Sequence, residues 1–191
     1  MLFFLTFESD ITYDTIDFMP ILTTIHRIGG VNLNGKTVHR TAVRGVIQRG
    51  GNLLMIFSAA VGDYKFPGGG VDAGESHVQA LAREIQEECG AELSHIGAEI
   101  GAVIEYALAE EPEFDTFKMT SHYYRCDVAG GFGSQKLDDY ERELGFAPVW
   151  VSIEDAIRQN KSLLHSVNAP EWLRREIFVL EYLLSPTVIS A

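Results

Sequence analysis

A glycine-rich loop that runs directly into an acidic helix constrains this 191-residue chain more than any other feature. The loop, residues 62–74, contains Gly68-Gly69-Gly70, and the spacing after it predicts a helix over 76–89 that ends at Gly90. Its apolar side chains repeat at helical intervals and predict one buried stripe: Val78, Leu81, Ala82, Ile85 and Cys89. The fold must therefore place the glycine-rich loop at the start of an amphipathic helix and bury the apolar face of that helix.

Three glutamates share one arc of this helix, beside the predicted buried stripe rather than opposite it. At 100° per residue, Glu84, Glu87 and Glu88 fall within an arc of about 100°. Like charges this close repel one another, and a bound divalent cation would relieve that repulsion. Arg83, four residues before Glu87, is placed to orient or neutralise it. An acidic helix face is also often simply solvated, so the helix alone leaves both interpretations open.

The loop supplies groups that suit a phosphate. Glycines let backbone amides and carbonyls approach a ligand closely, and a helix N-terminus favours anions. Loop and helix together predict a metal–polyphosphate site, with Gly68 and Gly70 among its substrate contacts. Arg44 and Lys65 are the predicted side-chain contacts to phosphate, and the alternative for each is an ordinary surface charge.

The rest of the chain alternates between strand and helix patterns. Strands are predicted over 37–48, 53–57, 96–108, 117–128 and 147–151, helices over 153–160 and 170–184, and a further candidate strand over 21–28. This order favours helices packed on a mixed sheet. The stretch 127–145 is glycine-rich and then acidic, and is expected to be an irregular connection.

Composition narrows the range of partners. With 27 acidic against 15 basic side chains the net charge is −12, which disfavours a broad grip on a nucleic-acid polymer. Cys89 and Cys126 lack the spacing of a disulfide framework or a structural zinc site. No run approaches the roughly 20 apolar residues that span a bilayer, and the start lacks the basic region of a signal peptide. No membrane association and a cytoplasmic location are therefore expected.

The spacing of residues 69–91 resembles the Nudix box, G-x5-E-x7-R-E-U-x-E-E-x-G-U, where U is a bulky aliphatic residue. The matching positions are Gly69, Glu75, Arg83-Glu84-Ile85, Glu87-Glu88 and Gly90. The one departure is Ala91, which is smaller than the residue the family usually has. The segments 64–67 and 149–152 are also similar to MutT-type members, so the likeness covers roughly residues 37–160.

The resemblance implies a Nudix hydrolase domain over 37–185, preceded by an extension, residues 1–36, of unclear role. It implies an α/β fold, an α/β/α sandwich with a mixed β-sheet flanked by helices. It also implies hydrolysis of a diphosphate linkage in a nucleotide or nucleotide derivative, with Mg²⁺ or Mn²⁺ as cofactor. The partner would be a small-molecule nucleotide diphosphate, and a homodimer stays open. The alternative is a catalytically weak Nudix module that binds a nucleotide as a sensor or regulator, most simply suspected where a box acid is missing; none is missing here.

The roles implied by the resemblance fall on matching positions. Glu84, Glu87, Glu88 and the carbonyl of Gly69 match metal ligands, and Arg83 and Glu75 match residues that orient the acids. Family members often use one more acid outside the box, because carboxylates that hold a metal are poor bases. The candidates here are Asp138, Asp139, Glu141 and Glu143. We favour Glu141 or Glu143, which lie nearer the following strand, and the alternative is a solvated acidic loop.

Overall fold

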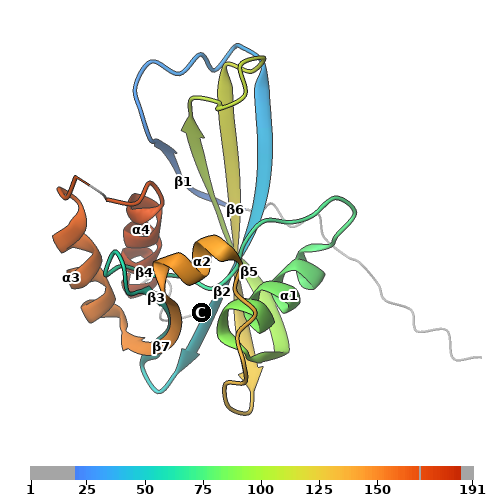
Figure 1. The fold of residues 1–191 in the computed structure, drawn as a ribbon, viewed down its shortest axis with the longest axis vertical. Helices are drawn as coiled ribbons and strands as arrows, with labels where there is room; N and C mark the ends of the chain where they lie inside the picture. The colour runs from blue at the N-terminus through green and yellow to red at the C-terminus, as the bar shows by residue number, and fades with distance from the viewer. Residues whose placement is uncertain (1–19, 168, 186–191) are drawn as a thin grey trace, which may run out of the picture.

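A mixed sheet forms the centre of the molecule in the computed structural model, which describes residues 20–167 and 169–185 (Figure 1). The strands are β1 (Ile21–His26), β2 (Thr37–Arg49), β3 (Asn52–Ser58), β4 (Tyr64–Lys65), β5 (Glu92–Ala107), β6 (Thr116–Ala129) and β7 (Phe146–Ser152). The helices are α1 (His77–Cys89), α2 (Asp139–Leu144), α3 (Ile153–Leu163) and α4 (Leu173–Leu184). All the helices and strands predicted from the pattern are present among these elements.

The strands lie in the order β1-β5-β6-β2-β3-β4, and β7 pairs with β3. The long strand β2 runs parallel to β6, from Thr37 beside Thr116 to Ile47 beside Cys126. β5 runs antiparallel to β6, and β1 joins the sheet in parallel beside β5. The candidate strand over 21–28 is thus confirmed as β1, whereas residues 1–19 of the predicted extension lie outside the described residues.

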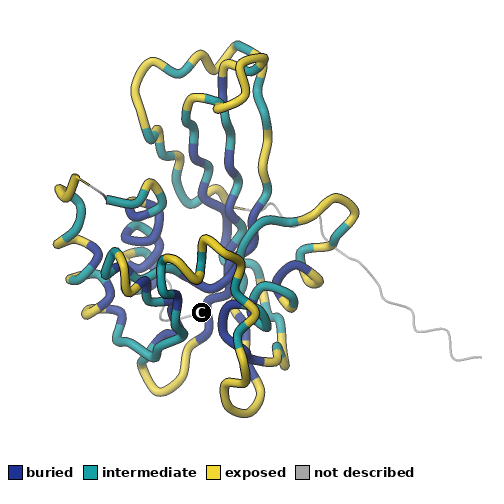
Figure 2. The backbone as a smooth tube through the Cα atoms, in the orientation of Figure 1, coloured by how far each residue is buried: buried dark blue, intermediate teal, exposed yellow. Residues whose placement is uncertain are grey.

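Helices cover both faces of the sheet. Since successive side chains of a strand point to opposite faces, β2 contributes side chains to a core on each face. On one face, Val43 and Ile47 of β2 pack with Leu81 and Ile85 of α1. On the other face, Val46 of β2 packs in a second core with side chains of α3 and α4. The predicted α/β/α sandwich is confirmed. Figure 2 shows that burial is greatest where helices cover the sheet, while the far ends of β2, β5 and β6 are mostly half-buried or exposed.

The structure corrects the predicted buried face of α1. Val78 is 57% exposed and Ala82 is also exposed, whereas Ala80 and Glu88 are buried together with Leu81. The buried face is therefore turned toward the acids. The reason is that the glycine loop packs against this side of the helix and supplies a partner for the buried carboxylate, as described below.

The stretch 127–145 was expected to be irregular, but its acidic part forms the short helix α2. Asp138 caps this helix, since its side chain accepts the N–H of Glu141 at 2.8 Å while Glu141 accepts the N–H of Asp138 at 3.1 Å. A capping box of this kind can begin a helix without any apolar periodicity. Among the described residues, no helix is long and apolar enough to cross a membrane.

Candidate active site

The helix α1, which carries the box acids, is fixed at both ends. At its start, Ser76 and Gln79 form a reciprocal capping box. At its end, carbonyl groups that a helix leaves unpaired are met by the segment 133–136. The N–H of Lys136 donates to the carbonyl of Glu87 at 2.8 Å, and the side-chain amide of Gln135 donates to the carbonyl of Glu88 at 2.5 Å. The acids therefore project from a helix whose axis is held in place.

Arg83 draws the helix and the preceding loop together. Its guanidinium donates to both carboxylate oxygens of Glu75, at 2.9 and 2.8 Å, and to the carbonyl of Gly70 at 3.0 Å. It also contacts Glu84 at 2.7 Å and Glu87 at 3.5 Å. These bonds lower the pKa of Glu75 to about 2. Arg83 thus links Glu75, the glycine loop and the helix acids, and the orienting role of Arg83 and Glu75 stays a proposal.

Glu84 lies directly against the glycine loop. Its carboxylate is so close to Gly69 that a Cβ built there would be 2.4 Å from both oxygens. A Cβ on Gly68 would in turn lie 2.2 Å from the carbonyl oxygen of Val43, and Gly68 has a φ of +130°. Burial raises the pKa of Glu84, and the nearby charge of Glu88 adds to this effect while Arg83 opposes it. Glycine at position 68 is required by this close approach to β2 and by its φ, and glycine at position 69 leaves the space that the carboxylate of Glu84 occupies.

Glu88 is the most buried of the three helix acids, with 1% of its side chain exposed. Its Oε2 accepts the backbone N–H of Gly68 at 2.7 Å. Its Oε1 lies 2.7 Å from the ammonium of Lys65 but makes no directional hydrogen bond with any described residue. Glu87, by contrast, is 39% exposed. The three acids share one side of the helix at different depths.

The backbone of the glycine loop pairs with β2, and this pairing decides where its carbonyls point. The carbonyl of Gly69, the predicted metal ligand, accepts the N–H of Val43 at 2.9 Å and so is directed at β2. Ligation through this oxygen would require a second contact on the same atom, and it stays a proposal. The carbonyl of Gly68 accepts a bond from the guanidinium of Arg44, which is 8% exposed. Arg44 thus reaches the loop from the sheet and is not a surface charge.

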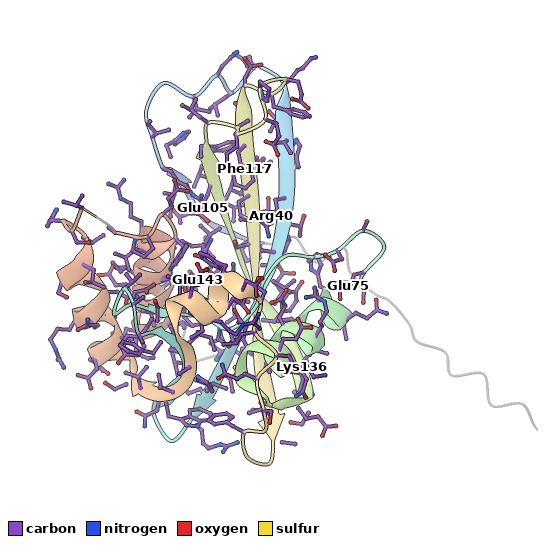
Figure 3. All side chains as sticks on the ribbon, in the orientation of Figure 1. Arg40, Glu75, Glu105, Phe117, Lys136 and Glu143 are labelled. Atoms are coloured by element: carbon purple, nitrogen blue, oxygen red, sulfur yellow. The ribbon has the colours of Figure 1, made fainter. Side chains whose placement is uncertain are left out.

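The two favoured candidates for the acid outside the box lie in different surroundings. Glu141 is partly buried at the start of α2, and burial, followed by the nearby charge of Glu88, raises its pKa to about 6. Glu143 is exposed, as are Asp138 and Asp139 (Figure 3). Of the four, Glu141 is the carboxyl that lies near the helix acids and has a raised proton affinity.

Buried side chains of α3 and α4 hold the segment before the glycines. Asn160 accepts the N–H of Tyr64 and donates to its carbonyl, both at 2.8 Å. Glu176 accepts the N–H of Phe66 at 3.0 Å, and Trp172 donates to Asp63 at 2.8 Å. Sequence reasoning missed these residues. The sequence of α4 does not single out Glu176, because the helix carries four charged side chains, Arg174, Arg175, Glu176 and Glu181.

Two polar residues of β6, Arg125 and His122, lie away from the box acids. Arg125 is exposed on β6, in a shallow hollow that it shares with His95 and Asp127 and with none of the box acids. His122, also on β6, has its Nδ1 2.8 Å from a carboxylate oxygen of Glu99. Neither one joins the acid cluster.

The residues fit a divalent cation, although no three acidic, cysteine or histidine side chains of the described part already form a cage. Carboxylate oxygens are the donors that Mg²⁺ and Mn²⁺ prefer. Glu88 offers a buried oxygen that is paired with the ammonium of Lys65, and the carboxylate of Glu84 fills the space beside Gly69. Arg83 and Lys65 compensate the acids in this arrangement and hold them apart.

Comparison with known proteins agrees with this geometry. A family model described as the NUDIX domain matches residues 38–174. The chain belongs to the Nudix family. The predicted enzyme class, a Nudix pyrophosphohydrolase, is confirmed with it. The match also includes the end of α3 and the first residues of α4, which lie beyond the stretch, roughly residues 37–160, that the resemblance covers.

Several solved structures are similar to this chain at low sequence identity. A NUDIX hydrolase from Nitrosomonas europaea has 18% identity and a TM-score of 0.51, covering 74% of this chain and 90% of its own. The E. coli ORF135 protein has 24% identity and a TM-score of 0.49, covering 82% and 99% respectively. A MutT NUDIX hydrolase from Burkholderia pseudomallei has 24% identity and a TM-score of 0.47, covering 61% and 85%. No curated protein matches this chain.

Proposed function

We propose that this Nudix protein hydrolyses a diphosphate linkage in a nucleotide or nucleotide derivative, with Mg²⁺ or Mn²⁺ as cofactor. The observation that carries the proposal is the position of Glu84 and Glu88 against the glycine loop, with the buried Oε1 of Glu88 paired with the ammonium of Lys65. A metal-binding side and a backbone surface suited to phosphate thus meet at one place. Residues 37–185, which contain this site, would form the catalytic domain. The cytoplasmic location and the homodimer stay predictions.

Each part of the site has a defined task in this proposal. Glu84, Glu87 and Glu88 hold the cation, and Arg83 with Glu75 orients the acids. The cation, when bound, neutralises charge on the phosphates and lowers the pKa of a bound water. Gly68, Gly70, Arg44 and Lys65 contact the phosphates. Gly68, Gly70 and Arg44 are held by hydrogen bonds before the substrate binds, and groups fixed in this way favour the transition state.

Glu141 takes the proton from the attacking water. Its raised pKa gives it a higher proton affinity than an ordinary carboxylate, and it lies near the helix acids without contacting Arg83. A base whose pKa lies near the working pH transfers protons efficiently. Glu143 is exposed to solvent. These features support Glu141, rather than Glu143, as the proposed base.

A panel of nucleotides and nucleotide diphosphate derivatives tests the proposal directly. Purified protein is incubated with each compound and Mg²⁺ or Mn²⁺, and the products are separated and identified as nucleotide fragments. Cleavage at a diphosphate bond is the expected result, and Glu87→Gln protein should not support it. If the protein binds a nucleotide but hydrolyses it with neither Mg²⁺ nor Mn²⁺, the result would instead identify a sensor or regulator.

A further inference from the structure

Lys65 occupies the oxygen of Glu88 that a divalent cation would use. Its ammonium lies 2.7 Å from Oε1, while Oε2 is already bonded to the N–H of Gly68. Only 14% of the Lys65 side chain is exposed, and its ammonium also lies 4.3 Å from the centre of the Phe146 ring. The contact is therefore an enclosed charge pair and differs from a solvated surface ion pair.

The backbone on either side of Lys65 is fixed by buried side chains. Asn160, which is fully buried, bonds both the N–H and the carbonyl of Tyr64. Glu176, also fully buried, accepts the N–H of Phe66. Because this backbone is fixed, Lys65 would have to leave Glu88 by rotation of its own methylene chain rather than by a shift of β4.

We propose that Lys65 is an internal counter-ion that takes the place of the cation at Glu88 and must be displaced when the cation binds. This inference rests on the proposed function, since it assumes that Glu88 is a metal ligand. A cation within about 2.1 Å of Oε1 and an ammonium at hydrogen-bond distance from the same atom would strongly repel each other. The two positive charges therefore exclude one another at this oxygen.

Displacement has two opposite consequences. Competition from Lys65 weakens cation binding, because part of the binding free energy is spent on removing the ammonium from Glu88. In the metal-free protein the same ammonium compensates a buried carboxylate that would otherwise be unpaired, a situation that is strongly destabilising. Lys65 thus stabilises the empty site and keeps its affinity for the cation below what the acids alone would give.

Binding of Mn²⁺ to Lys65→Met protein, followed by electron paramagnetic resonance in the absence of substrate, tests the inference. Loss of the competing charge should lower the Mn²⁺ dissociation constant about tenfold or more, given the strength of a unit charge at this distance. Melting without metal should occur at a lower temperature than in wild type, and the rise caused by saturating Mn²⁺ should be larger. Lys65→Arg keeps the charge and should stay close to wild type. Lys65→Gln gives the same test if the methionine variant does not fold.

Lys136→Met is the matched control. Lys136 is exposed beside α1, where its N–H meets the carbonyl of Glu87, and no contact of its ammonium with an acid is seen among the described residues (Figure 3). Both variants change the net charge equally. Equal tightening in the two would show a general effect of charge, and unchanged or weaker binding in Lys65→Met would contradict displacement; either result overturns the inference.

Glu88→Gln separates this inference from the proposed function. If wild-type protein binds Mn²⁺ and Glu88→Gln does not, Glu88 is a ligand and the Lys65 variants decide the inference alone. If Glu88→Gln binds Mn²⁺ as well as wild type does, the proposed metal site itself fails, and the role of Lys65 fails with it.

Discussion

At the scale of single residues, the adjacent acids Glu87 and Glu88 differ in burial although both match glutamate positions of the Nudix box. Glu88 is buried and paired with Gly68 and Lys65, whereas 39% of the Glu87 side chain is exposed. Box spacing identified both acids before the structure was known. It did not indicate their depths, because depth depends on how the loop packs against the helix.

This difference predicts that the two acids separate activity from stability. Glu87→Gln and Glu88→Gln should each lower kcat by about 10²-fold or more, the scale of losing one fixed electrostatic contact. Only Glu88→Gln should also lower the melting temperature of the metal-free protein, because Lys65 loses its charged partner. Steady-state kinetics and thermal melts measure the two effects. Glu92→Gln, an exposed position just after the helix, is the control, and an equal fall in both melting temperatures would contradict the depth argument.

A second prediction concerns the pH dependence of Glu141. A carboxyl with a pKa of about 6 is charged above that pH and becomes protonated as the pH falls through it. A base loses activity when protonated, so kcat should fall on the acid side near pH 6. Glu141→Gln should lower kcat with little change in KM and remove this acid limb. The pH–rate profile of exposed Glu143→Gln should match wild type; an altered profile there with none in Glu141→Gln would reverse the assignment.

At the scale of elements, α1 is held by segments distant in sequence. The segment 133–136 meets the last carbonyls of the helix, and Gln135 also donates to the carbonyl of Phe146 at 3.1 Å. Periodicity predicted the helix itself to within a residue at each end. It could not predict this docking, because a lone glutamine in a glycine-rich stretch has no pattern that distinguishes it from a solvated residue.

Gln135→Ala should therefore destabilise the protein. The substitution leaves two carbonyls without their partner, for a cost of about 1–3 kcal/mol. Urea unfolding measures the loss, and the Mn²⁺ dissociation constant should rise because the end of the acid helix is less firmly held. Ser134→Ala, at the exposed neighbouring position, is the control. An unchanged unfolding midpoint for Gln135→Ala would show that water replaces the amide without loss.

At the scale of the whole molecule, the fold was predictable because strand and helix periods are distinct and their order is typical of helices on a mixed sheet. The exceptions have physical reasons. β4 is too short to carry a pattern, and α2 is specified by its capping box and has no apolar stripe. The partners of the loop, Asn160 and Glu176, lie about a hundred residues from it, a distance over which spacing carries no information.

Net charge predicts how the molecule responds to metal as a whole. At −12, the protein repels a polyphosphate, so a bound cation is needed to bring the two together. Chelator-treated protein should be inactive, and Mg²⁺ or Mn²⁺ should restore turnover and raise the melting temperature, since binding only to the folded state stabilises it. Calorimetry and product analysis follow the two effects. Full turnover in excess chelator would rule out metal dependence.

The parallel pairing of β2 with β6 also sets when the site can exist during synthesis. Thr37 pairs with Thr116, so nearly eighty further residues must be synthesised after the start of β2 before its partner strand β6 exists. The helix of the box can coil locally in that time, but its supports at 133–136 and 160–176 follow still later. At roughly 5–20 residues per second, the emerging chain carries an unassembled acid cluster for several seconds or longer. The cation is therefore expected to bind only after most of the chain has been synthesised.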